Sequence, residues 1–142
     1  MKDLINALKE VDRLRKEYKF GNIMYNEQYI ELMIADELGH IWNDGQGPDA
    51  FGLDGEKYEY KTINSVDGKG SFQFHWITTD NVHKYEEFDK VYFVWRDGMI
   101  IKEIVEVEMS DIFPMLESKA KSGGKKGHWS VSLKKIKEYS SL

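Results

Sequence analysis

With 142 residues, the chain is long enough to bury the core of one domain and too short for a second. Hydrophobic residues make up 41% of it and aromatic residues 13%. It contains no cysteine, which excludes a disulfide scaffold, a thiol nucleophile and a zinc–thiolate site, so any metal must be held by oxygen or imidazole. The net charge is −5, yet residues 119–142 carry +6 and residues 1–118 carry −11. An acidic body with a basic end permits a nucleic-acid contact face.

No leader-like segment opens the chain, and no run approaches the roughly 18 apolar residues of a membrane span. We therefore expect a cytoplasmic protein without membrane contact.

The first quarter of the chain predicts two helices. Apolar residues at spacings of three and four indicate an amphipathic helix over residues 3–19. Its apolar stripe consists of Leu4, Leu8, Val11, Leu14 and Tyr18. A second helix is expected over residues 27–42, opened by Asn26 as N-cap and ended by two glycines and Pro48.

The rest of the chain is mostly strand-like. Strands are expected at residues 49–53, 57–64, 72–78, 88–95, 99–108 and 128–133, with hairpin turns at Asp54-Gly55 and Asp97-Gly98. Ser110 is expected to cap a short helix with Pro114 near its first turn, and residues 119–127 to form a lysine- and glycine-rich loop. Phe72, Phe74 and Trp76 alternate as core residues. This order predicts a single α/β or α+β domain with a mixed sheet flanked by helices.

Two carboxylates and one lysine follow the glycine-rich break. Glu59 and Lys61 are two residues apart on one strand, so they share a face. Asp49 joins that face if Asp49 lies opposite Lys61 and Phe51 opposite Glu59, which requires an odd loop or a bulge at residues 53–57.

This residue set suits phosphodiester hydrolysis. Two carboxylates can hold Mg²⁺ with positions left for water and phosphate, and a lysine can stabilise charge that develops on the phosphate oxygens. The alternative is that Glu59 and Lys61 are an exposed salt-bridging face of a hairpin. The functional interpretation is favoured because Asp49 follows Pro48 at a strand start and the other two residues lie among apolar neighbours.

Pro48-Asp49 followed by Glu59-Tyr60-Lys61 resembles the PD-(D/E)xK nuclease motif. The similarity extends over roughly residues 20–137 to PvuII-like type II restriction endonucleases, and it is most specific over residues 49–64. Matching positions outside that core are Lys69-Gly70, His75, Lys84-Tyr85, Arg96, Gly98 and the segment 104–112.

The resemblance implies a restriction-endonuclease-like fold and a Mg²⁺-dependent homodimer that cuts short palindromes in double-stranded DNA, beside a cognate DNA methyltransferase. It implies one nuclease domain over residues 1–142, with residues 1–25 as a dimerisation helix and residues 26–142 as the catalytic and DNA-recognition core. Asp49 and Glu59 match the metal-binding carboxylates, with Tyr60 as a further candidate ligand, and Lys61 matches the catalytic lysine. Tyr85 matches a tyrosine near the metal and water, or equally packs over a neighbouring element.

The base-reading positions depart from the family pattern. His75 matches one histidine of a cluster of three, but Phe74 and Trp76 flank it, so the cluster is not retained. His128 falls where the family has a base-reading asparagine pair, and Asn26 aligns with an acidic DNA-contacting position or is only a helix cap. The candidate DNA-binding residues are Asn26, Lys69, Gln73, His75, Lys125, Lys126, His128 and Ser130. Alternatively, His128 is only the first residue of a strand, and Lys125 and Lys126 belong to a solvated loop.

Three functions are therefore considered. The favoured one is a sequence-specific restriction endonuclease. A structure-specific nuclease of the same fold, such as a Holliday-junction resolvase, would share Asp49, Glu59 and Lys61, and the stretch through His75 and Tyr85 counts against it. An inactive DNA-binding domain is disfavoured by the intact catalytic set.

Overall fold

The computed structural model describes residues 1–122 and 127–140. Its helices are α1 (Lys2–Glu17), η1 (Tyr25–Glu27), α2 (Gln28–Leu38), η2 (Val82–Glu87), α3 (Met109–Ser122) and α4 (Leu133–Ser140). Its strands are β1 (Ile41–Trp42), β2 (Ala50–Phe51), β3 (Lys57–Asn64), β4 (Ser71–Phe74), β5 (Lys90–Asp97), β6 (Ile100–Glu108) and β7 (Trp129–Ser132).

The strands form two sheets. The larger has the order β1-β2-β3-β5-β6, in which β3 and β5 run parallel and the other neighbours antiparallel. Strands β4 and β7 make a separate antiparallel ribbon. A mixed sheet flanked by helices in one α+β domain was predicted and is confirmed.

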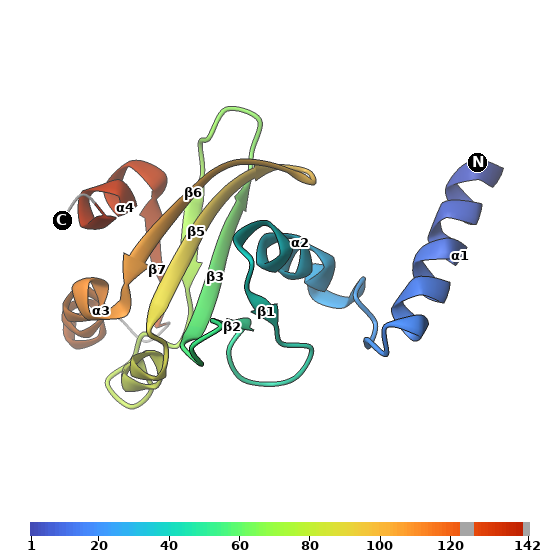
Figure 1. The fold of residues 1–142 in the computed structure, drawn as a ribbon. Helices are drawn as coiled ribbons and strands as arrows, with labels where there is room; N and C mark the ends of the chain where they lie inside the picture. Colours follow the sequence, from blue (N-terminus) through green and yellow to red (C-terminus); the bar gives the residue numbers. More distant parts are fainter. Residues whose placement is uncertain (123–126, 141–142) are drawn as a thin grey trace.

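Both faces of the large sheet are buried, because side chains alternate along each strand. In β5, Val91 and Phe93 enter one core while Tyr92 and Val94 enter the other. The first core is closed by the β4–β7 ribbon, α3 and α4, and the second by α2 (Figure 1). In β3, Tyr58 and Tyr60 face α2, so Glu59 and Lys61 face the ribbon.

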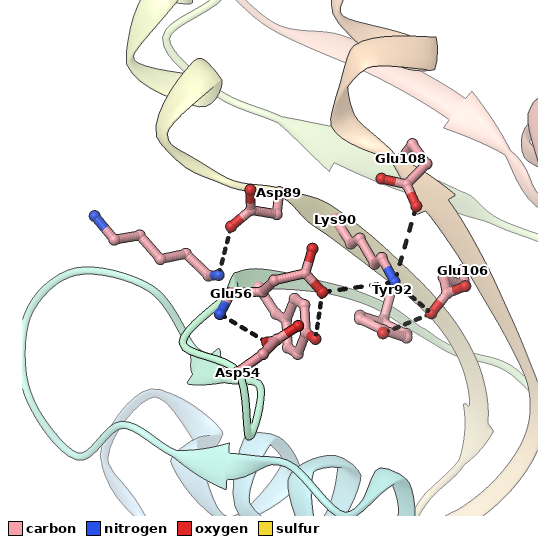
Figure 2. A network of polar contacts seen from close by, with 9 residues as sticks. Asp54, Glu56, Asp89, Lys90, Tyr92, Glu106 and Glu108 are labelled. Carbon is pink, nitrogen blue, oxygen red and sulfur yellow. Dashed lines mark hydrogen bonds and ion pairs between the residues drawn. The ribbon is translucent and has the colours of Figure 1, made fainter.

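A polar network ties the β2–β3 turn to β5 and β6 (Figure 2). The Lys90 ammonium lies 3.6 Å from a Glu106 oxygen and 3.8 Å from oxygens of Glu56 and Glu108. The Tyr92 hydroxyl donates to Glu106, and Asp89 accepts the backbone N–H of Lys57 at 2.8 Å. One cation thereby holds three carboxylates together beside the strand that carries Glu59.

Several local predictions are wrong at element ends. The second helix ends at Leu38, where Gly39 takes a left-handed φ of 69°, and residues 41–42 form β1. Asn26 does not cap α2: it has a φ of 50° inside η1, and Glu27 occupies the cap position. Ser110 lies inside α3 rather than at its cap, and that helix extends through residues 119–122, which were expected in a loop.

Two further differences affect exposure. The chain after β7 forms α4, which was not predicted; its buried residues are Leu133 and Ile136. Trp76 is not in the core: β4 ends at Phe74, and Trp76 is 72% exposed with a φ of 63°. Within the described residues, none of the helices is long and apolar enough to cross a membrane.

Candidate active site

Asp49 is positioned by the loop that precedes it. The Asn43 side chain donates to the carbonyls of Gln46 and Pro48, which fixes the glycine-rich break. The backbone N–H of Asp49 then donates to the Tyr58 carbonyl at 3.0 Å, and its Oδ2 accepts the backbone N–H of Tyr60 at 2.8 Å. The carboxylate is therefore held against β3 beside Glu59.

The strand register differs from the predicted one by two residues. Phe51 lies opposite Lys57 and Ala50 opposite Tyr58, whereas Phe51 was expected opposite Glu59. The connection over residues 52–56 is odd in length, as the prediction required, so the parity is preserved. The two-residue shift is why Asp49 meets Glu59 rather than Lys61.

The carboxylates of this site repel one another in a partly dry environment. Burial raises the pKa of Glu59 to about 8, the charge of Asp49 adds to the shift, and the Lys61 ammonium opposes it. Glu31 of α2 is a third acid: burial, then a hydrogen-bond contact with Asp49 and the charges of Asp49 and Glu59, raise its pKa to about 9. Without a metal, Glu59 and Glu31 therefore keep their protons at neutral pH, and a bound cation would favour their ionised forms.

Lys61 is held by aromatic rings. Its ammonium lies 4.9 Å from the centre of the Phe74 ring and 5.9 Å from that of Tyr85. Among the described residues it makes no ion pair, so it remains available to an anionic ligand.

A pocket of about 370 Å³ opens beside these groups. It is lined by Glu59, Trp76, Asn81, Lys84, Tyr85, Glu87 and Phe88. Glu59 is therefore reachable from solvent through a wall that also carries a lysine and an exposed tryptophan.

The donor set fits a hard divalent cation. Within residues 1–122 and 127–140, no three His, Asp or Glu side chains are arranged to hold a metal. Mg²⁺ needs only one or two carboxylates plus water and phosphate oxygens, and Asp49 with the partly buried Glu59 supplies the carboxylates. The Tyr60 side chain does not belong to the set, because its hydroxyl lies on the α2 side against His40 Nδ1 at 2.7 Å, which leaves only its carbonyl as a ligand.

Tyr85 lines the pocket but is engaged elsewhere. Its hydroxyl donates to the His75 carbonyl at 2.7 Å. Burial and the charge of Glu59 raise the pKa of this phenol to about 12, so the hydroxyl keeps its proton at neutral pH. The Tyr85 ring packs on Phe74 and also lies near Lys61, so its position is compatible both with a packing role and with a role near the metal and water.

The β4–β7 ribbon gathers four of the predicted DNA-binding residues on its exposed face. Ser130 Oγ donates to Gln73 Oε1 at 2.7 Å, and His75 meets His128 with 2.8 Å between their Nδ1 atoms. The ribbon thus brings together two histidines that lie 53 positions apart in the sequence. Phe72, Phe74 and Val131 fill the opposite, buried face of the ribbon.

Two other predicted DNA-binding residues, Lys69 and Asn26, are not brought to this face. Lys69 is exposed at the far end of β4 from His75, 3.8 Å from Asp67. Asn26 lies at the entrance to α2, where its neighbour Glu27 pairs with the buried Arg96 at 3.2 Å. Lys125 and Lys126 lie outside the described residues.

Glu31 is the site residue that the sequence reasoning missed. In the sequence, Glu31 stands out only as an acidic residue within an otherwise apolar helical stretch, Ile30 to Ala35, in the helix that precedes the motif.

Comparison with known proteins agrees with the geometry. No curated protein matches the chain. The family model described as restriction endonuclease PvuII matches residues 1–139, nearly the whole sequence, including both carboxylates and the lysine. The chain therefore belongs to the PvuII restriction endonuclease family.

Proposed function

We propose that the protein cuts double-stranded DNA at a specific palindromic sequence by Mg²⁺-dependent phosphodiester hydrolysis. The observation that carries the proposal is that Asp49 and the partly buried Glu59 lie together near Lys61, with Glu59 lining the pocket. Lys61 makes no ion pair within residues 1–122 and 127–140. Membership of a restriction endonuclease family supports DNA as the substrate.

The carboxylates of Asp49 and Glu59, with the Tyr60 carbonyl, would hold the cation. When bound, Mg²⁺ supplies a Lewis acid and lowers the pKa of a coordinated water. The Tyr60 N–H orients the Asp49 carboxylate by donating to its Oδ2. Lys61, anchored over Phe74, places a positive charge where a scissile phosphate gains negative charge in the transition state.

The proposal includes a homodimer, because two centres related by two-fold symmetry suit cleavage of both strands of a palindrome. Residues 1–25 are proposed as the dimerisation segment. None of the residues of α1 is buried, and the helix projects from the body (Figure 1). Leu4, Ile5 and Leu8 are exposed along it, an apolar face that a second copy would cover. A methyltransferase of matching specificity completes the proposed restriction system.

Digestion of plasmid DNA tests the function. We expect discrete fragments with Mg²⁺, none with EDTA, and at least a 10³-fold slower reaction for Asp49→Asn and Lys61→Met. His83→Gln, an exposed residue of η2, is the matched control and should cut like the parent. Cleavage of branched DNA only would favour a resolvase, and no cleavage of any DNA would favour an inactive binding domain.

A further inference from the structure

Trp76 is held in a strained backbone conformation just after the end of β4. Its φ is 63°, in the left-handed region that a bulky side chain rarely adopts. On one side the His75 carbonyl accepts the Tyr85 hydroxyl at 2.7 Å. On the other side the N–H of the buried Ile77 donates to the Gly127 carbonyl at 2.7 Å. Strain of this kind persists only where the surrounding contacts enforce it, and it is typical of ligand-binding sites.

The indole of Trp76 has no partner in the part of the chain that the structure describes. The residue is 72% exposed, and its side chain makes no hydrogen bond and no ring contact there. An aromatic ring of this size gains free energy when it is covered. The strained backbone therefore presents the ring for contact with another molecule rather than for packing in the core.

The ring borders the pocket of about 370 Å³ that also contains Glu59. This volume lies within the range of roughly 300–1,000 Å³ that is usual for small-molecule sites. Tyr85 and Phe88 add aromatic walls, and Asn81 adds a polar group. The Asn81 Nδ2 donates to the Thr78 hydroxyl at 3.1 Å, and no donor among the described residues occupies its Oδ1, which can accept an N–H.

The charge of the pocket favours a neutral ligand. The charged side chains that line it, among the described residues, are Glu59, Lys84 and Glu87, and together they give no net positive charge. A second phosphate is therefore disfavoured there, whereas a neutral planar ring can lie against the aromatic walls. Nucleobases are rings of this kind, and each base has a π-face that an aromatic side chain can cover.

Resting on the proposed function, we propose that the pocket encloses a base turned out of the DNA helix, from a nucleotide that adjoins the scissile phosphate, and that Trp76 stacks on this base. Under that function Glu59 places the scissile phosphate at the pocket, so an adjoining nucleotide is the part of the substrate within reach of Trp76. A base inside the duplex is covered on both faces, so it must leave the helix to enter the pocket. Stacking on Trp76 offsets the free energy of stacking and pairing that the base loses.

Variants of Trp76 test the proposal on the cognate duplex, identified by sequencing the cut ends, with binding measured in EDTA. Trp76→Gly removes the ring and relieves the strain, because glycine adopts a φ of 63° readily, and Trp76→Phe keeps a ring. We expect Trp76→Gly to bind roughly 5- to 150-fold more weakly, the size of one base–aromatic stack, and Trp76→Phe to recover most of the loss. Met99→Ala, which changes a 62% exposed residue of the β5–β6 turn, should bind like the parent. Urea unfolding verifies that each variant is folded.

Modified duplexes then identify the base. When the base is removed from one of the two nucleotides that adjoin the cut, the parent and Trp76→Gly should bind equally. When it is removed from the other nucleotide, their difference should persist. 2-Aminopurine at the first nucleotide should brighten when Trp76→Phe binds, because it leaves the duplex stack that quenches its fluorescence and a phenyl ring quenches it little.

Three results would overturn the proposal without touching the nuclease activity. They are parent-like binding by Trp76→Gly, a loss in Trp76→Gly that persists with either base removed, and 2-aminopurine that stays dark at both nucleotides. Absence of both specific cleavage and specific binding in the parent would instead overturn the proposed function and, with it, the base in this pocket.

Discussion

Glu59→Gln should stabilise the metal-free protein while it abolishes cleavage. The folded chain holds Glu59 partly buried beside Asp49, and this desolvation, with the charge of Asp49, raises its pKa from 4.5 to about 8. In the unfolded chain the same group is ionised above pH 4.5, so folding takes up a proton at neutral pH. The folded state therefore loses stability as pH rises from about 4.5 to 8. Glutamine cannot ionise, and the variant lacks this loss.

The magnitude follows from the pH interval. At pH 7 the group lies about 2.5 units above its ordinary pKa of 4.5, at about 1.4 kcal/mol per unit. Glu59→Gln should accordingly raise the free energy of unfolding by on the order of 3 kcal/mol at pH 7, and by less than about 1 kcal/mol at pH 5. The gain at pH 7 is an upper value, since Glu31 and Asp49 redistribute protons with Glu59.

Urea unfolding at pH 5, 7 and 8.5 in EDTA measures the difference in the free energy of unfolding between Glu59→Gln and the parent. The difference between variant and parent should widen with pH, and the exposed control Glu37→Gln should follow the parent throughout. Mg²⁺ should stabilise the parent more than Glu59→Gln, because the cation neutralises the charge that the variant lacks. A difference between variant and parent that is flat with pH would refute the burial argument.

Two other changes test the fold and the assembly. Lys90→Met should lower the free energy of unfolding by about 1 kcal/mol, less at high salt, because it leaves three half-exposed carboxylates facing one another. Lys102→Met on the neighbouring strand β6 is the control, and urea unfolding at two salt concentrations measures the difference. Leu8→Glu should convert the proposed dimer to a monomer in sedimentation and slow double-strand cutting while the body stays folded, since Leu8 is 48% exposed on a helix that contributes no buried residue. A variant that remains dimeric would place the interface elsewhere.

Local periodicity was sufficient to predict most of the fold. Strand β3 matches its predicted range of residues 57–64, and the hairpin turn at Gly98 adopts a φ of 60°, the left-handed conformation that glycine favours. The failures occur where tertiary packing outweighs local preference. Helix α4 is short, and Leu133, Ile136 and Tyr139, its only apolar residues, recur at spacings of three, but Leu133 was assigned to the preceding strand. Ile136 is fully buried against the core, and this packing stabilises a helix of only eight residues.

As with the fold, only some residues of the candidate site could be predicted from the sequence. The sequence motif pointed to Asp49, Glu59 and Lys61 as one set, because strand alternation and an odd loop suffice to bring them to one face. Glu31 was beyond reach, since its proximity to Asp49 depends on how α2 crosses the sheet. The histidine pair was equally hidden: His75 and His128 are 53 positions apart and meet only because β4 pairs with β7.

A short series of contacts joins the exposed face of the β4–β7 ribbon to the candidate active site. The carbonyl of His75 accepts the Tyr85 hydroxyl, and the Tyr85 ring lies 5.9 Å from the Lys61 ammonium, which also sits over Phe74. Phe74 is fully buried in the core and belongs to the same strand as Gln73, so the core fixes the position of the ribbon relative to Lys61. Under the proposed function, docking of DNA against the exposed face of the ribbon and placement of Lys61 at the phosphate are therefore mechanically linked. A mismatched base pair would hold the ribbon away and leave the lysine displaced from the phosphate, which gives discrimination in the cleavage step as well as in binding.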